Sequence, residues 1–192
     1  MPENVEIERR FLVDGRSNRP WIHQSVEKIS ITQWYLDSVQ LMVSEDDGTL
    51  SYSGETILTN LASEVCQTLR ENSHWTVRIR KWNNTHLLTL KGPKVGAIAS
   101  EYEWEIQGEI ANSIIQHSTY PRIEKNRFLW KGDDGLLWEI DEFEGNLAGL
   151  IIAEVELENE NAELIIPNWA GMELTYLKGW SNSALANMLS QE

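Results

Sequence analysis

The sequence is short of cysteine, of positive charge and of long apolar runs. Its 192 residues include one cysteine, Cys66, which excludes an internal disulfide and a cysteine-based metal cluster. Lysine and arginine number 16 against 30 acidic residues, and the net charge of −14 argues against nucleic acid as a partner. No apolar stretch approaches the roughly 20 residues of a membrane-spanning helix. We therefore expect no membrane partner and a cytoplasmic protein, and the sequence leaves a homodimer open.

What the sequence contains is alternation of polar and apolar residues with a period of two, which is typical of strands with one apolar face. The predicted strands are Val5–Val13, Ile29–Leu36, Trp75–Trp82, Thr85–Lys91, Glu101–Gln107, Arg122–Leu129, Leu136–Phe143 and Ile151–Glu158. Short helices are predicted over Glu109–His117 and from Ser181 or Asn182 to the C terminus. Eight strands with short connections favour an antiparallel sheet, a sandwich or a barrel, in one mainly β (α+β) domain over residues 1–192.

The stretch over residues 37–72 interrupts this pattern. Val39–Val43 and Thr49–Tyr52 can pair as a hairpin across Asp47-Gly48. Apolar residues then recur at helical spacing, which predicts an amphipathic helix over Glu55–Arg70. We expect this stretch to be an inserted hairpin and helix.

Pairs of like charges occupy the polar positions of the predicted strands. The pairs are Glu6 and Glu8, Arg78 and Arg80, Glu103 and Glu105, Lys125 and Arg127, Glu139 and Asp141, and Glu154 and Glu156; Arg10 follows the first pair and Lys91 ends its strand. Side chains at i and i+2 share a face, and adjacent like charges repel each other. One such pair is an ordinary solvated strand face. Six pairs, with their signs segregated by strand, indicate strands that face one another across a shared lumen.

The opposite faces of these strands are apolar. They carry Ile7, Val77, Ile79, Trp104, Ile140, Val155 and Leu157. If the charged faces line a lumen, these residues point outward and need cover, which we expect the helices to provide. The prediction is a barrel that is charged inside and apolar outside.

The segregated charges suggest a ligand. Carboxylates hold hard cations such as Mg²⁺ or Mn²⁺, usually together with substrate phosphates, and arginine and lysine bind phosphate oxygens. These are the components of phosphoryl or nucleotidyl transfer, in which catalysis is mostly positioning and charge neutralisation. So many cations favour a small molecule with four or five negative charges.

Eight short motifs follow one another along the chain: EIERRF (6–11), QWYL (33–36), VRIR (77–80), LTLKG (88–92), EYEWEI (101–106), IEKNRF (123–128), WEIDEF (138–143) and AEVEL (153–157). In sequence and in order they resemble the motifs of a known family, the CYTH proteins or triphosphate tunnel metalloenzymes. This resemblance implies an eight-stranded antiparallel closed β-barrel, a tunnel with a charged lumen clad by a few helices. It also implies metal-dependent hydrolysis of inorganic tripolyphosphate to pyrophosphate and phosphate.

The resemblance further assigns roles to the charged residues. The implied metal ligands are Glu6, Glu8, Asp141, Glu154 and Glu156, with Glu103, Glu105 and Glu139 as further carboxylates. The implied substrate contacts are Arg10, Arg78, Arg80, Lys91, Lys125, Arg127 and Tyr35, of which Lys91, Lys125 and Arg10 are the candidate catalytic residues. Two Mg²⁺ or Mn²⁺ ions are expected, one bridging the phosphates and one activating the attacking water.

Three residues depart from the family pattern as we read it. Arg10 stands where the signature has lysine, and Glu101 and Gly179 stand where basic residues are common. Four other functions therefore stay open. The chain could act on an organic triphosphate such as thiamine triphosphate or a nucleotide, act as a class IV-type adenylate cyclase, bind polyphosphate or nucleotides without hydrolysis, or carry its charged face for structure alone.

Overall fold

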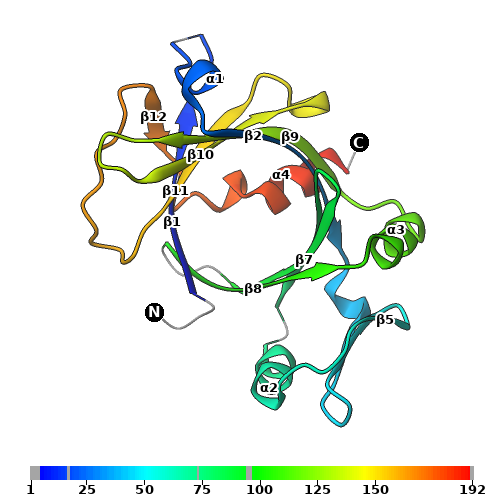
Figure 1. The fold of residues 1–192 in the computed structure, drawn as a ribbon. Helices are drawn as coiled ribbons and strands as arrows, with labels where there is room; N and C mark the ends of the chain where they lie inside the picture. The colour runs from blue at the N-terminus through cyan, green and yellow to red at the C-terminus, as the bar shows by residue number, and fades with distance from the viewer. Residues whose placement is uncertain (1–4, 17, 73, 94–96, 191–192) are drawn as a thin grey trace.

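A closed β-barrel forms the body of the protein. The structure, a computed structural model, describes residues 5–16, 18–72, 74–93 and 97–190. The barrel strands are β1 (Val5–Val13), β2 (Glu27–Leu36), β6 (Thr76–Trp82), β7 (Thr85–Lys91), β8 (Ile98–Ile106), β9 (Arg122–Lys131), β10 (Leu137–Phe143) and β11 (Ile151–Glu156). They follow the order β11-β10-β9-β2-β6-β7-β8-β1, and β11 also pairs with β1, which closes the ring (Figure 1). All these pairings are antiparallel, so the predicted eight-stranded barrel is confirmed.

Strand register determines which residues face the lumen. Glu8 lies opposite Glu156 where β1 pairs with β11, and Asp141 lies opposite Arg127 where β10 pairs with β9. Because residues directly opposite each other project from the same face of a sheet, the charged positions of neighbouring strands all point inward. The lumen is therefore the charged face, as the alternation predicts.

The outer face is apolar and is covered in two ways. Over β6, β7 and β8, α3 (Gly108–Gln116) packs with the inserted segment around Val77 and Ile79. Over β1, β10 and β11, the cover is mainly aromatic side chains from loops, α1 (Trp21–Gln24) and the chain that follows β11. Trp169 lies within 5.5 Å, between ring centroids, of both Trp21 and Trp138. Helices therefore cover part of the outer face, as expected, and on this side loop side chains add to the cover that α1 provides.

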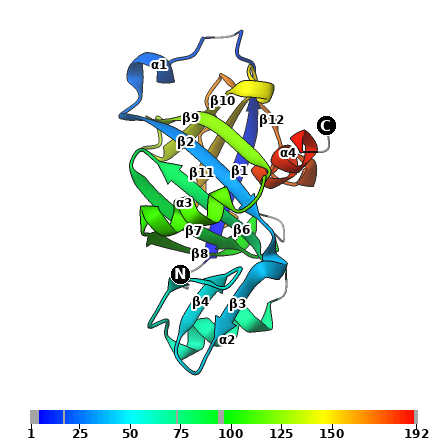
Figure 2. The same ribbon diagram turned by 90° about the vertical axis from the view of Figure 1, so that its right-hand side faces the viewer.

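The inserted segment between β2 and β6 contains a small antiparallel sheet and one helix, below the barrel in Figures 1 and 2. Its elements are a 3-10 turn (Ser38–Gln40), β3 (Leu41–Ser44), β4 (Thr49–Tyr52), β5 (Glu55–Leu58) and α2 (Ser63–Glu71). The predicted helix over Glu55–Arg70 is wrong in its first part. Ser53 and Gly54 both have positive φ (49° and 85°), which is the backbone of a tight hairpin turn, so residues 55–58 return along β4 as a strand.

The C-terminal part of the chain closes one end of the barrel. After a 3-10 turn (Gly145–Leu147) and β11 come β12 (Ala170–Glu173), which pairs with β1, a 3-10 turn (Lys178–Trp180) and α4 (Asn182–Leu189). Ser181 caps α4 by accepting a hydrogen bond from the amide of Ala184 at 3.1 Å. Leu174, Leu185 and Ala186 pack with apolar residues of the strands, and α4 crosses the end of the ring (Figures 1 and 2).

The helix predicted to reach the terminus ends at Leu189, and residues 191–192 lie outside the described residues. Among the helices described, none has the length and apolarity to cross a membrane.

Candidate active site

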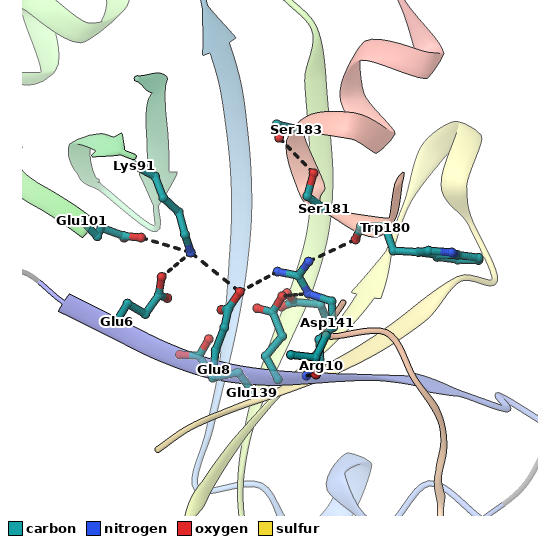
Figure 3. A network of polar contacts seen from close by, with 12 residues as sticks. Glu6, Glu8, Arg10, Lys91, Glu101, Glu139, Asp141, Trp180, Ser181 and Ser183 are labelled. Atoms are coloured by element: carbon teal, nitrogen blue, oxygen red, sulfur yellow. Dashed lines mark hydrogen bonds and ion pairs between the residues drawn. The ribbon is translucent and has the colours of Figure 1, made fainter. Parts of the chain in front are cut away.

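Arg10 lies at the centre of the charged lumen, where β1 meets β11. Its Nη2 donates to Glu8 Oε1 at 2.9 Å and its Nε donates to Glu154 Oε1 at 2.6 Å. Its Nη1 reaches the carbonyl of Trp180 at 3.4 Å (Figure 3). Burial works against the charge, but the carboxylates of Glu154 and Glu8 raise the pKa of Arg10 above its ordinary value. Burial opposes the charge of Glu154 as well, yet Arg10 and the nearby lysines and Arg127 lower the pKa of Glu154.

A second set of ion pairs lies on β9 and β10. Arg127 donates from Nε and Nη2 to the two carboxylate oxygens of Asp141, each at 2.8 Å, and it also pairs with Glu139. Lys125 pairs with the same Asp141, which is 1% exposed. Burial lowers the pKa of Lys125 to about 8, against the attraction of Asp141. This is the most deeply buried charge cluster of the lumen.

Lys91, at the end of β7, contacts three carboxylates: Glu101 directly opposite it on the neighbouring strand β8, and Glu6 and Glu8 on β1. It pairs with Glu6, and its Nζ lies 3.3 Å from Glu101 Oε2 and 3.8 Å from Glu8 Oε1 (Figure 3). Glu101, noted above as a departure from the family pattern, therefore joins the acidic side of the lumen and holds a cation. Burial disfavours the charged form of Lys91, but Glu8 and Glu6 raise its pKa above the ordinary value.

Arg78 and Arg80 on β6 are paired far more loosely. The Nη2 of Arg78 lies 3.6 Å from Glu101 and donates to Thr89 at 3.2 Å, whereas the Nη2 of Arg80 lies 3.8 Å from Glu103. The Nε atoms of both arginines are buried and find no hydrogen-bond acceptor within the described part of the chain. Burial, and then the nearby Arg78 and Arg127, lower the pKa of Arg80 to about 10. Two buried guanidinium groups with spare donors form a site for an anion.

The carboxylates of the lumen are in excess on the β1–β11 side. Partial burial, and then the charges of Glu139, Glu6, Glu8 and Glu101, together raise the pKa of Glu156 to about 7. Oxygen donors crowded in this way fit a divalent cation such as Mg²⁺ or Mn²⁺. Among the described residues no three carboxylates converge as a ready ligand set, because several of them are turned toward arginine or lysine instead.

A cavity of about 380 Å³ opens between the strands and the C-terminal segment. Its charged side includes Glu8, Arg10, Arg78 and Lys91. Its other side is residues 175–183, which we call the C-terminal wall; this contributes hydroxyl, amide and apolar groups and one cation, Lys178. The cavity therefore places phosphate-binding groups beside a largely neutral surface.

The remaining predicted residues are placed as follows. Tyr35 lines the cavity and accepts a hydrogen bond from Gln33 Nε2 at 2.6 Å, and burial raises the pKa of Tyr35 to about 12. Glu103 accepts a hydrogen bond from Thr89 at 2.7 Å. Glu105, opposite Leu87 further along β8, is exposed to solvent.

The structure also adds residues that the sequence reasoning missed. Gln33 and Thr89 share the inward face of their strands with predicted residues two positions away, so the period of two could have identified them. The C-terminal wall carries no such period, and only the fold brings it to the cavity.

Comparison with known proteins settles the family. The profile of the CYTH domain matches residues 62–183. The chain belongs to the CYTH family. An inorganic triphosphatase of Acetivibrio thermocellus is 42% identical over 111 residues, which are 57% of this CYTH chain and 70% of that protein. An inorganic triphosphatase of Nitrosomonas europaea is 36% identical over 112 residues, 57% of this chain and 74% of that one.

A solved structure supports the same assignment for the fold. The crystal structure of the inorganic triphosphatase NE1496 superposes on this CYTH protein with a TM-score of 0.56 at 27% identity, covering 94% of this chain and 93% of that one. The likeness in structure therefore extends well beyond the residues that the family profile matches.

Proposed function

We propose that this CYTH protein hydrolyses inorganic tripolyphosphate to pyrophosphate and phosphate, in a reaction that depends on Mg²⁺ or Mn²⁺. The observation that carries the proposal is the lumen itself, which has an excess of carboxylates on one side and loosely paired arginines on the other. Two relatives with the printed name inorganic triphosphatase support the choice of substrate.

In this proposal the carboxylates that would hold two ions are Glu6, Glu8, Glu154 and Glu156, with Asp141 completing the set. Glu139 on β10 and, on β8, Glu103 and Glu105 are further candidate carboxylates in this proposal. When bound, the ions would neutralise phosphate charge and activate the attacking water. Glu8 and Glu154 each accept a hydrogen bond from Arg10, so this guanidinium lies beside two of the carboxylates that would hold an ion.

The chain's own cations position the phosphate chain. The Nε atoms of Arg78 and Arg80 have no acceptor among the described residues, so these are the first groups that we expect to bind a polyanion. Lys125 and Arg127 are more deeply buried, whereas Lys91 lines the cavity from β7. We assign Lys91, Lys125 and Arg10 to charge neutralisation at the reacting phosphate and its leaving oxygen, because positioning and neutralisation provide most of the catalysis in phosphoryl transfer. Tyr35 borders the same cavity and contacts the substrate in this proposal.

The test is phosphate release from tripolyphosphate, ATP, thiamine triphosphate and pyrophosphate, each with Mg²⁺, Mn²⁺ or EDTA. We expect release that needs a metal ion and is largely confined to tripolyphosphate. Faster release from ATP or thiamine triphosphate would move the assignment to an organic triphosphatase. Binding of tripolyphosphate without release would indicate a sensor.

Glu156→Gln tests the carboxylate assignment. Mutating a residue that only hydrogen-bonds to a metal ligand typically lowers metal affinity or activity about 10–100-fold. Loss of a direct ligand should therefore lower turnover by more than about 100-fold. Exposed Glu158→Gln, two residues further along the chain, is the matched control and should retain wild-type turnover. Metal-dependent activity that survives in Glu156→Gln would remove this residue from the site.

A further inference from the structure

Arg9, on the outside of the barrel, forms a two-point ion pair with the strand that precedes the C-terminal wall. Its Nε donates to Glu173 Oε1 at 2.8 Å and its Nη2 donates to Glu173 Oε2 at 2.7 Å. The pair is partly buried, with side-chain exposures of 27% and 33%, and the Arg9 guanidinium lies 5.3 Å from the ring centroid of Phe11. Two-point arginine–carboxylate pairs fix geometry as well as charge, so the position of β12 on β1 is well defined here.

The chain passes from the outside to the inside of the barrel immediately after Glu173. Leu174 is fully buried among the apolar residues at the end of the lumen, and its amide donates to the carbonyl of Arg10 at 2.7 Å. Thr175 connects the two sides, because its hydroxyl donates to Glu173 Oε1 at 2.7 Å and accepts from the amide of Arg10 at 3.0 Å. The outer ion pair and the lumen arginine are therefore joined by two hydrogen bonds through one threonine.

Arg9 and Arg10 hold the same segment from opposite faces of β1. Successive side chains of a strand project to opposite faces, so Arg9 cannot enter the lumen that Arg10 occupies. Inside, Arg10 reaches the carbonyl of Trp180, in the middle of the C-terminal wall (Figure 3). Outside, Arg9 holds Glu173, where that wall begins.

We propose that Arg9 is a positioning residue for tripolyphosphate, acting through Glu173 and Thr175 on the C-terminal wall. It touches neither the cavity nor the reacting phosphates. Its role is to keep residues 175–183 against the cavity. The inference rests on the proposed function, because it concerns the binding of that substrate.

Arg9→Met keeps the unbranched stem of the side chain and removes the guanidinium group that forms both hydrogen bonds to Glu173. We expect the KM for tripolyphosphate to rise about fivefold or more while kcat changes less than about twofold, because the wall loosens while the strand-borne residues remain in place. Hydrogen exchange in the metal-free protein should be about tenfold faster at residues 174–183 and unchanged in β6 and β7.

Three companion variants separate positioning from general destabilisation. Arg9→Lys keeps the charge without the guanidinium group and should be intermediate in KM and in exchange. The exchanged pair, Arg9→Glu with Glu173→Arg, restores the ion pair but removes the carboxylate that accepts from the Thr175 hydroxyl, so it should recover only part of the loss. Arg70→Met removes an exposed, one-point 2.9 Å pair with Glu45 on the inserted segment and should change neither measurement.

The exchange measurement needs no turnover, so it tests the inference even if the wild-type protein releases no phosphate. Failure of the proposed function would be visible in the wild-type assay itself. If Arg9→Met leaves exchange at residues 174–183 unchanged, or accelerates exchange throughout the barrel, Arg9 does not position the wall. Faster local exchange with an unchanged KM in an active enzyme would equally overturn the inference.

Discussion

Arg80 provides the sharpest test of the charged lumen. Its buried charge should lower the stability of the ligand-free protein, while the same charge should stabilise the bound anion. The side chain is 12% exposed, and its nearest carboxylate contact in the structure is Glu103 at 3.8 Å. Burial, then Arg78 and Arg127, hold the pKa of Arg80 at about 10 instead of 12.5. Because this folded-state pKa lies below the unfolded value, the cost of the charge is fully present at every pH well below 10.

The size of the effect follows from that pKa. A fall from 12.5 to about 10 corresponds to roughly 3 kcal/mol against the charged form in the folded state. Arg80→Met keeps most of the stem and loses the long contact to Glu103, so we expect a net stabilisation of about 1–2 kcal/mol. For a chain of this length that is a rise in Tm of about 2–8 °C.

Arg127→Met is the contrasting variant, because Arg127 is as buried as Arg80 but is closely paired. Its removal leaves Asp141 with one partner fewer and takes a cation from Glu139 and Glu154. Removing one member of a buried ion pair typically costs about 3–5 kcal/mol, so this variant should lose stability.

Thermal unfolding at pH 7.5, with and without tripolyphosphate and Mg²⁺, measures both effects. Free Arg80→Met should unfold at a higher temperature than the wild type, and its gain in Tm on adding ligand should be smaller. Free Arg127→Met should unfold at a lower temperature than the wild type. A lower Tm for free Arg80→Met would refute the reasoning, since it would mean that other groups in the lumen stabilise the charge of Arg80 in the folded protein.

Three further predictions concern other parts of the molecule. Asp141→Asn should destabilise the protein by about 3–5 kcal/mol in chemical denaturation, because Lys125 and Arg127 lose their shared carboxylate; a loss below 1 kcal/mol would contradict the pairing. Burial lowers the pKa of His86, so its neutral form is favoured in the folded state and stability is lost as pH falls below about 6.5. The stability advantage of the wild type over His86→Gln should accordingly shrink between pH 7.5 and 5.5, and a constant difference would exclude His86 as the cause. Gly171→Ala should displace β12, because a Cβ there would lie 2.6 Å from the carbonyl of Leu12; faster hydrogen exchange confined to residues 170–175 is the expected signal, and unchanged exchange would contradict it.

The faces of the strands could be predicted from the sequence because side chains in a strand alternate with a period of two. This was enough to place Glu8, Arg80 and Asp141 on a common charged surface and Ile79 on the opposite one. Local chemistry also narrowed the helix cap to Ser181 or Asn182, and the structure has Ser181, whose hydroxyl accepts from a free amide of the first turn.

Other features depend on contacts between segments far apart in the chain. Helical spacing over Glu55–Arg70 was misleading because the positive φ of Ser53 and Gly54 sends the chain back along β4. Which carboxylate holds which cation follows from strand order. Lys91 meets Glu6 because β1 and β7 both flank β8, a neighbourhood that no spacing within either strand encodes.

The C-terminal wall is the clearest case of a feature that depends on contacts between distant segments. Residues 175–183 have no alternation and no charge pair, so nothing local marks them as part of a site. They reach the cavity because β12 pairs with β1 and Arg9 holds Glu173, 164 residues away in the chain. The sequence by itself determined the charged and apolar faces, since these depend on the geometry of single strands. The composition of the cavity was decided by the tertiary structure, because barrel closure selects which faces and which loop come together.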